Sequence, residues 1–392
     1  MQQDLCRNSI EVEEPEMKIV FISTMSGPWG GSEELWSRAA LRLRGEGHDV
    51  AASVIWQPTL SPKVLALREQ GLELTAYSFP HQHNLVKRTW HKLRRRLPIV
   101  DEDTRWLRAR KPDLVVISQG ENVDGVEWME LCQRERLPYV AIVHCNFEGW
   151  WPTDAAASSV SRAYAGAKRV YCVSHHNLAL LEDQIGESLP NAQVIWSPFN
   201  VPTAEPPSWP EENGVWKFAC VGRLDPVAKG QDVLLKVLAH PQWRARPIEV
   251  SLYGEGPRQQ SLRSMAKRLG LSNLYFRGYV DDVRSIWEQN HLLVLPSRYE
   301  GLPLALLEAM YCARPALVTD VGGNAEMCVD GETGFVAAAP AVRDVEQALA
   351  RAWDSRAEWR TMGMRGRRRA EELIPKDPVG DFCQCLTGFV GN

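Results

Sequence analysis

Two glutamates with seven residues between them, Glu300 and Glu308, are the first candidates for chemistry in the sequence. Pro303 fits the first turn of a helix, where its missing N–H costs nothing, so Glu300 should lie in the loop before that helix. The helix is apolar on every side except at Glu308, which predicts that it is buried. A lone buried carboxylate is costly unless it accepts hydrogen bonds, and the paired hydroxyls of a ribose would supply them. An ion pair between Glu308 and Arg314 is the structural alternative.

Two cations, Arg223 and Lys229, flank a short segment just past a predicted strand at residues 217–221. Lys229 comes just before a predicted helix, so both side chains should lie at the carboxyl edge of the sheet. A forked guanidinium and a compact ammonium can together neutralise a diphosphate. Two solvated surface charges are the alternative.

A glycine-rich loop at residues 27–32 follows the first predicted strand and opens the first predicted helix. The pair Gly30-Gly31 would let the backbone approach an oxyanion closely, and Ser32 is predicted to cap the helix. No dinucleotide-binding Gly-x-Gly-x-x-Gly can be drawn through the loop, which disfavours a nicotinamide oxidoreductase. A merely tight turn between strand and helix is the alternative.

Short apolar runs alternate with helical patterns along most of the chain, which predicts an α/β fold of two doubly wound domains with mostly parallel sheets. We expect a disordered acidic tail over 1–16, a first domain over 17–200, a proline-rich linker over 201–215, a second domain over 216–374 and a C-terminal segment over 375–392. The predicted strands cover residues 18–22, 50–55, 114–117, 139–143, 170–173, 194–196, 217–221, 248–253, 274–276, 292–295, 316–319 and 334–337. Ligands of such sheets bind beyond the carboxyl ends of the strands, so we expect a ligand in a cleft between the domains.

The composition of the 392-residue chain, with 44% hydrophobic and 24% charged residues, is that of a globular protein. The net charge of −4 gives no reason to expect nucleic-acid binding. Five acids and one base lie in the first 16 residues, so the remainder is neutral. We expect a cytoplasmic protein with reduced thiols, because the nine cysteines are scattered and the N-terminus opens polar and acidic.

Several motifs in order resemble the retaining, nucleotide-sugar-dependent glycosyltransferases of family 4, which have the two-domain GT-B architecture. The resemblance extends over nearly the whole chain from Met17. The motifs that carry it are the Gly30-Gly31 pair, the Gly-Arg-Leu…Lys-Gly run at 222–230, Tyr-Gly-Glu-Gly-Pro at 253–257, the Glu300 and Glu308 pair, Val-Gly-Gly-Asn-Ala-Glu at 321–326 and Asp-Gly-Glu-Thr-Gly at 330–334.

The resemblance implies a role for each matching residue. Arg223 and Lys229 would bind the donor diphosphate, Glu308 the donor ribose and Glu300 the transferred sugar. Gly30 and Gly31 would close over the donor phosphates, and His144 would lie near the reacting side of the sugar. Main-chain N–H groups of Gly301 and Leu302 would surround the sugar and phosphate, and the nucleobase would lie near Arg277, Gly278, Tyr279 and Val280. The C-terminal segment would cross back to the first domain.

The resemblance also implies transfer of a hexose-type sugar from a UDP- or GDP-linked donor with retention of configuration. It implies no metal and no cofactor, with Arg223, Lys229 and helix N-termini stabilising the leaving diphosphate. No protein nucleophile is evident, and Glu300 is the only near candidate. Two other functions stay open at this stage: a catalytically silent nucleotide-sugar-binding partner subunit, and a sugar-nucleotide epimerase on the same architecture.

The acceptor is expected to be a glycan or a lipid-linked molecule of envelope polysaccharide or glycoconjugate synthesis. Residues 86–97 form a basic pattern in which Val86, Trp90, Leu93 and Leu97 share one helical face, so this helix could rest on the inner face of an anionic membrane. A solvated surface helix is the alternative. Trp150 and Trp151 follow His144 and could stack on an acceptor sugar, or simply pack between the domains.

Overall fold

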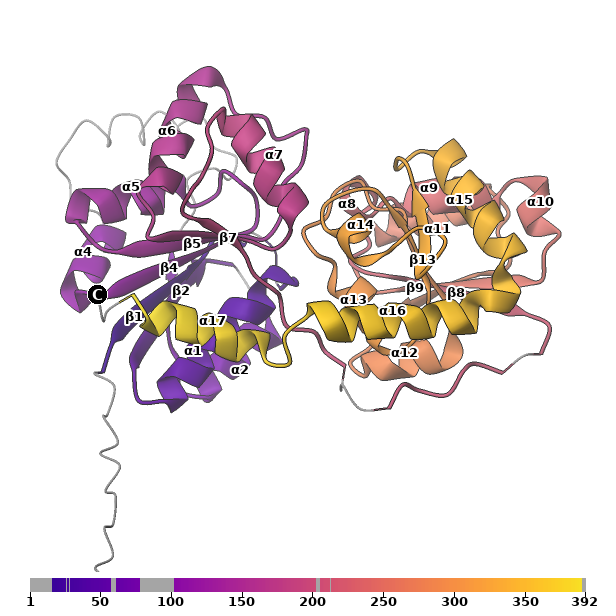
Figure 1. The fold of residues 1–392 in the computed structure, drawn as a ribbon, viewed down its shortest axis with the longest axis horizontal. Helices are drawn as coiled ribbons and strands as arrows, with labels where there is room; N and C mark the ends of the chain where they lie inside the picture. Colours follow the sequence, from indigo (N-terminus) through magenta and orange to yellow (C-terminus); the bar gives the residue numbers. More distant parts are fainter. Residues whose placement is uncertain are drawn as a thin grey trace, which may run out of the picture.

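The computed structural model describes residues 16–25, 27, 29–57, 61–77, 102–201, 205–211 and 213–389. Within them the chain forms two lobes that lie side by side along the long axis of the molecule, each built on a parallel sheet with helices on both faces (Figure 1). The predicted α/β class with two doubly wound domains is confirmed.

The sheet of the first domain has the strand order β3-β2-β1-β4-β5-β6-β7 in the described residues. Its strands are β1 (Lys18–Ser23), β2 (Asp49–Ile55), β3 (Glu73–Tyr77), β4 (Leu114–Gln119), β5 (Tyr139–Val143), β6 (Arg169–Cys172) and β7 (Ala192–Val194). The helices are α1 (Ser32–Gly45), α2 (Pro62–Glu69), α4 (Glu102–Arg110), α5 (Val126–Glu135), α6 (Asp154–Ala165) and α7 (His175–Ile185). Strands β1, β4 and β5 are buried along almost their whole length, as helix cover on both faces requires.

The sheet of the second domain has the order β10-β9-β8-β11-β12-β13. Its strands are β8 (Trp216–Val221), β9 (Ile248–Tyr253), β10 (Leu274–Gly278), β11 (Leu292–Leu295), β12 (Ala316–Thr319) and β13 (Gly334–Ala337). Its helices are α8 (Pro226–Lys229), α9 (Gln231–Leu238), α10 (Pro241–Arg244), α11 (Gln259–Arg268), α12 (Val283–Gln289), α13 (Leu304–Tyr311), α14 (Asn324–Met327), α15 (Val342–Asp354) and α16 (Trp359–Leu373).

The strand order of each sheet reverses once, between β1 and β4 in the first and between β8 and β11 in the second. A crevice opens at such a reversal, because the connections leave the two strands in opposite directions. The loops after these four strands hold the glycine-rich loop, Arg223 and Glu300. The topology therefore gathers residues from the first 32 positions of the chain with residues near position 300.

The predicted strands are confirmed with ends shifted by at most two residues, and one strand was missed. The missed strand is β3, an edge strand with a single buried residue, Tyr77, so its sequence lacks an apolar pattern. The prediction that Ser32 caps α1 is wrong. Gly31 occupies the N-cap position with helical φ and ψ of −59° and −27°, so Ser32 already lies inside the helix and no side chain caps it.

The C-terminal helix α17 (Pro378–Thr387) belongs spatially to the first domain, where it runs beside α1 while α16 stays on the second domain (Figure 1). Phe382 packs edge-on against Tyr171 of β6 with ring centroids 5.4 Å apart. Arg42 of α1 forms an ion pair with Asp377, which also caps α17. The end of the chain thus ties the two domains together.

Candidate active site

An ion pair between the buried Glu300 and the partly buried Lys229 lies at the strand reversal of the second domain. Lys229 Nζ is 2.7 Å from both carboxylate oxygens of Glu300, and Ser297 Oγ donates to one of them at 2.7 Å. Glu300 is 5% exposed. The turn between α8 and α9 reaches this place because Gly230 has φ 62° and a Cβ there would lie 1.8 Å from the Pro296 carbonyl oxygen. Two residues 71 positions apart in the sequence thus form one ion pair.

Arg223 follows β8, and its side chain extends toward the glycine-rich loop of the first domain. Its guanidinium lies 3.5 Å from Asp225, and a Cβ on Gly27 of the glycine-rich loop would lie 3.8 Å from its Nη1. Asp225 is shared with Arg258, so it neutralises only part of the local positive charge. The guanidinium therefore stands between the two domains, where an anionic ligand would meet it.

Glu308 is buried in α13, with 5% of its surface exposed. Burial raises the pKa of Glu308 to about 7, and hydrogen bonds from the side chain and backbone of Asn200 act in the opposite direction. The alternative of an ion pair with Arg314 is wrong, because the Arg314 guanidinium donates to main-chain carbonyls, among them that of Trp287 at 2.8 Å. Glu308 is thus a buried carboxyl that Arg314 does not neutralise.

His144 follows β5 directly and is buried. Its Nε2 lies 3.1 Å from Ser118 Oγ of β4, and burial lowers the pKa of His144 to about 3. The imidazole is therefore neutral at physiological pH. A Cβ on Gly301 would lie 1.8 Å from the His144 carbonyl oxygen, so only glycine allows these two loops to meet across the domain boundary. The contact brings His144 next to the loop that carries Glu300.

The glycine-rich loop approaches the N-terminus of α13. A Cβ on Gly31 would lie 3.4 Å from Leu304, the first residue of that helix, and the side chain of Leu302 just before it is 7% exposed. A Cβ on Gly30 would meet the end of the Met25 side chain at 2.4 Å. The two predicted phosphate-contacting segments, Gly30-Gly31 and the start of α13, therefore lie close together.

The segment predicted to hold the nucleobase lies at the carboxyl end of β10. Gly278 has φ 74° and its carbonyl accepts from the N–H of Gly254 at 2.7 Å, which joins the ends of β9 and β10. Tyr279 is 59% exposed, and Val280 packs partly against the core beside α13. An exposed tyrosine ring at this edge is available for stacking.

The two predicted acceptor tryptophans have different environments. Trp150 packs against Phe147 and against Tyr299 of the second domain, with ring centroids 5.8 Å and 4.9 Å away, so its interdomain packing alternative is the one observed. Trp151 is 60% exposed. The basic segment 86–97 lies outside the described residues.

Sequence reasoning missed two acidic residues, Glu121 and Asp124, in the loop after β4. Burial raises the pKa of Asp124 to about 7 and raises that of Glu121, while the positive charge of Arg223 lowers the latter. Glu121 thus lies near enough to Arg223 of the second domain to be affected by its charge. The sequence shows that both residues follow a buried strand. Only the order of the strands in the sheet shows that this strand lies at the reversal.

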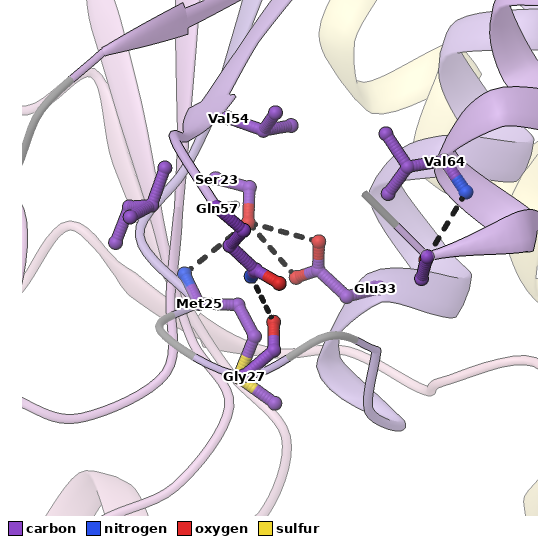
Figure 2. Close-up of a pocket in the computed structure, with 9 residues that line it drawn as sticks. Ser23, Met25, Gly27, Glu33, Val54, Gln57 and Val64 are labelled. Atoms are coloured by element: carbon purple, nitrogen blue, oxygen red, sulfur yellow. Dashed lines mark hydrogen bonds between the residues drawn. The ribbon is translucent and has the colours of Figure 1, made fainter. Parts of the chain in front are cut away.

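A small hollow beside the glycine-rich loop holds a further buried carboxyl, Glu33 (Figure 2). Both of its oxygens lie 2.9 Å from Ser23 Oγ at the end of β1, and burial raises the pKa of Glu33 to about 7. Gln57 crosses the hollow to donate to the Gly27 carbonyl at 2.6 Å. These contacts fix the base of the glycine-rich loop.

The domains also meet at the N-terminus of α7. The Glu326 carboxylate of α14 accepts from the backbone N–H groups of His175 at 3.1 Å and His176 at 2.8 Å. Such a carboxylate is well placed at the positive end of a helix.

Within the described parts of the chain, no helix is long and apolar enough to cross a membrane, and no group of three or more His, Cys, Asp or Glu side chains could hold a metal ion.

Two family profiles match the chain in succession. The profile of glycosyltransferase family 4 matches residues 29–200, and that of the group 1 glycosyl transferases matches residues 216–355. Curated relatives include D-rhamnosyltransferase WbpZ of Pseudomonas aeruginosa, 29% identical over 42% of this chain and 43% of that protein. Another is a GDP-mannose-dependent phosphatidylinositol monomannoside mannosyltransferase of Mycolicibacterium smegmatis, 26% identical over 50% of this chain and 56% of that protein. The matches thus span about half the length of these relatives.

Solved structures share the fold along nearly the whole chain. HepE of Anabaena, crystallised with UDP and glucose, superposes with a TM-score of 0.74 at 18% identity, covering 96% of this chain and all of that one. The lipopolysaccharide outer core galactosyltransferase WaaB superposes with a TM-score of 0.69 at 18% identity, covering 95% and 99%. From its two profile matches and its two domains with parallel sheets, the chain belongs to the family 4 glycosyltransferases and has their GT-B fold.

Proposed function

We propose that the protein transfers a hexose-type sugar from a nucleotide diphosphate sugar to a hydroxyl group of a glycan or lipid-linked acceptor. The observation that carries the proposal is the Lys229–Glu300 ion pair, with Arg223 on the loop after β8 and the buried Glu308 on the helix that follows Glu300. A diphosphate joined to a sugar on one side and a ribose on the other would be suited by cations together with carboxylates that accept from hydroxyl groups, and these four residues supply both.

The leaving diphosphate gains one negative charge as the bond from the anomeric carbon to its oxygen breaks. Arg223 and Lys229 supply fixed positive charge for it, and the glycine-rich loop and the N-terminus of α13 add backbone N–H groups. Lys229 has three N–H donors, so it can keep its bond to Glu300 while it meets a phosphate oxygen. We propose that this arrangement replaces a metal ion in the reaction.

Glu300 and the neutral His144 lie on opposite sides of the domain contact at Gly301. We propose that Glu300 accepts hydrogen bonds from sugar hydroxyls and that the His144 region bounds the other side of the sugar. The acceptor hydroxyl then attacks on the face from which the diphosphate leaves and gives its proton to a phosphate oxygen, which retains the configuration. The bond from the anomeric carbon to the phosphate oxygen breaks as the bond to the acceptor oxygen forms.

The donor is proposed to carry uridine or guanosine. The UDP- and UDP-glucose-bound HepE structures favour the first, and the GDP-mannose-dependent relative favours the second. The acceptor is proposed to meet the first domain near Glu121, Asp124 and Trp151, and residues 86–97 are proposed to contact anionic lipid.

The experiment is a thermal-shift screen of UDP, GDP and their sugars, followed by donor turnover with mixed glycan and lipid acceptors. A ligand at a hundredfold excess over its Kd should stabilise the fold by about 2.7 kcal/mol. NMR of the product reports the anomeric configuration, and activity in EDTA tests metal independence. Turnover without acceptor would indicate epimerisation, and binding without any turnover, unaltered by Glu300→Ala, would indicate a silent partner subunit.

A further inference from the structure

A second ion pair, between Arg298 and Asp232, joins the same two segments of the second domain as the Lys229–Glu300 pair. Arg298 Nη1 lies 2.6 Å from Asp232 Oδ1, and Arg298 Nη2 lies 3.0 Å from Asp232 Oδ2. The guanidinium thus binds the carboxylate through both arms, which fixes the angle between the two groups as well as their distance. Both side chains are partly buried, so water and salt screen this pair less than a surface pair.

Arg298 also binds the backbone of α8, the short helix that ends at Lys229. Its Nη1 donates to the Pro226 carbonyl, and its backbone N–H donates to the Ala228 carbonyl at 2.7 Å. Pro226 and Ala228 belong to α8, whereas Asp232 lies in the first turn of α9. One residue of the loop after β11 is therefore bonded to the helix that ends at Lys229 and to the helix that follows it.

The turn between α8 and α9 also touches this loop directly. A Cβ on Gly230 would lie 1.8 Å from the Pro296 carbonyl oxygen, so the two backbones are in contact. The stem of Lys229 lies beside Gly222, just past the end of β8, where a Cβ would be 3.6 Å from Lys229 Cε. The place of the ammonium group therefore depends on how the turn is held against the loop.

We infer that Arg298 and Asp232 are positioning residues for donor binding, and that their ion pair holds Lys229 where it meets the donor diphosphate. The inference rests on the proposed diphosphate-binding role of Lys229. In that role Lys229 shares its N–H donors between Glu300 and a phosphate oxygen, so its bond to Glu300 no longer fixes the turn by itself. The Arg298–Asp232 pair has its own partners and keeps the turn in place while the ligand is bound.

The shape of the Arg298 guanidinium matters here as much as its charge. Lysine carries a point charge on a flexible stem, whereas arginine presents a rigid fork that matches a carboxylate. Arg298→Lys therefore keeps the charge of the pair but loses its fixed angle and one of its two bonds. A backbone that is ordered in advance lowers the entropy cost of binding, so a looser turn weakens the affinity for the diphosphate.

The experiment compares Arg298→Gln, Arg298→Lys and Asp232→Asn with the parent protein. Arg351→Gln is the matched control, because Arg351 binds both oxygens of Asp330, at 2.9 Å and 2.8 Å, and donates to the Val336 carbonyl at 3.0 Å. Its helix, α15, belongs to the same domain and carries none of the proposed donor-binding residues. The Kd values of UDP and GDP are measured by calorimetry, together with the unfolding midpoint of each protein.

Arg298→Gln should weaken nucleotide binding about tenfold, and Arg298→Lys and Asp232→Asn should weaken it about threefold, because each of the latter two keeps one bond of the pair. Arg351→Gln should bind the nucleotides as the parent does, although it loses a comparable ion pair. The loss of affinity in Arg298→Gln should disappear in a Lys229→Met background, measured by ligand-observed NMR, since Arg298 acts through Lys229.

Equal losses of affinity in Arg298→Gln and Arg351→Gln would overturn the inference, because the loss of any ion pair of this domain would then have the same effect. An undiminished loss from Arg298→Gln in the Lys229→Met background would also overturn it, because Arg298 would then act without Lys229.

A parent protein that binds neither nucleotide would overturn the proposed function instead. A readout without nucleotide then decides the role of Arg298: the coupling between Lys229→Met and Glu300→Gln in the unfolding midpoint, measured with and without Arg298→Gln. Arg298→Gln should reduce this coupling by at least about half, because a looser turn no longer holds the ammonium against the carboxylate. An unchanged coupling would overturn the inference.

Discussion

The Lys229–Glu300 pair offers a quantitative test of the site through stability alone. The perturbation is a double-mutant cycle of Lys229→Met, Glu300→Gln and the combination. Glu300 keeps 6% of its side-chain surface exposed and Lys229 keeps 24%, so the two partners do not depend equally on each other. Removing the lysine strands a buried carboxylate, whereas removing the carboxylate leaves a lysine that still reaches water.

The expected magnitudes follow from that asymmetry. Breaking a fully buried pair costs about 3–5 kcal/mol, and the partial exposure of Lys229 reduces this to about 2–3 kcal/mol for Lys229→Met. Glu300→Gln should cost about 1 kcal/mol, because Ser297 can still donate to the amide oxygen. The double variant should lie near the less damaged single variant, with a coupling energy of about 1.5 kcal/mol or more.

The assay is thermal unfolding without ligand, where 1 kcal/mol corresponds to a shift of about 2–4 °C for domains of this size. UDP and GDP binding is measured in parallel, and Lys229→Met should lose it by more than about a hundredfold. Additive effects of the two substitutions, with equal costs below about 0.5 kcal/mol, would refute the argument that this pair is a desolvated unit of the cleft.

Three further outcomes are expected. Glu308→Gln should stabilise the free protein above about pH 7. The pKa of Glu308 is about 7 in the folded protein and 4.5 in the unfolded chain, so the parent loses stability as the pH rises from 4.5 through 7. The gain in the free energy of unfolding should be on the order of 2–4 kcal/mol at pH 8 and vanish below about pH 5. Gly301→Ala should fold but lose at least about a hundredfold in transfer rate, since the added methyl meets the His144 carbonyl and keeps the domains apart. Glu326→Gln should weaken the domain contact at α7, seen as a larger radius of gyration in solution scattering.

Each of these has a result that would contradict it. A Glu308→Gln protein with the parent's pH dependence of unfolding would show that Glu308 is not a buried acid of high pKa. Full transfer activity in Gly301→Ala would show that the close approach of the two loops is not used in the reaction. A Glu326→Gln protein with unchanged scattering, compared with an exposed control such as Glu332→Gln, would assign the domain contact to other residues.

The order of elements could be predicted from the sequence because buried parallel strands leave continuous apolar runs between turn residues. The strand β3 escaped prediction because an edge strand with one buried residue has no such run. The N-cap of α1 was misplaced by one residue because either a serine or a glycine can precede a first turn, and the backbone angles of Gly31 decide between them.

The sequence by itself determined which charged residues follow strands or lie on the helices next to them: Arg223, Lys229, Glu300 and Glu308. Local patterns are enough for this, since strand ends and helix starts are set by neighbours in the chain. It left open whether Glu308 pairs with Arg314 and whether Trp150 faces an acceptor or the other domain.

Only the tertiary structure decided those questions, because burial and partnership depend on residues far away in the sequence. Arg314 donates to main-chain carbonyls, and Trp150 packs on Tyr299. Asn200, from the crossing between the domains, lowers the pKa of the Glu308 carboxyl. The pKa of a buried group is set by the dielectric and the dipoles around it, and these exist only once both domains have folded and met.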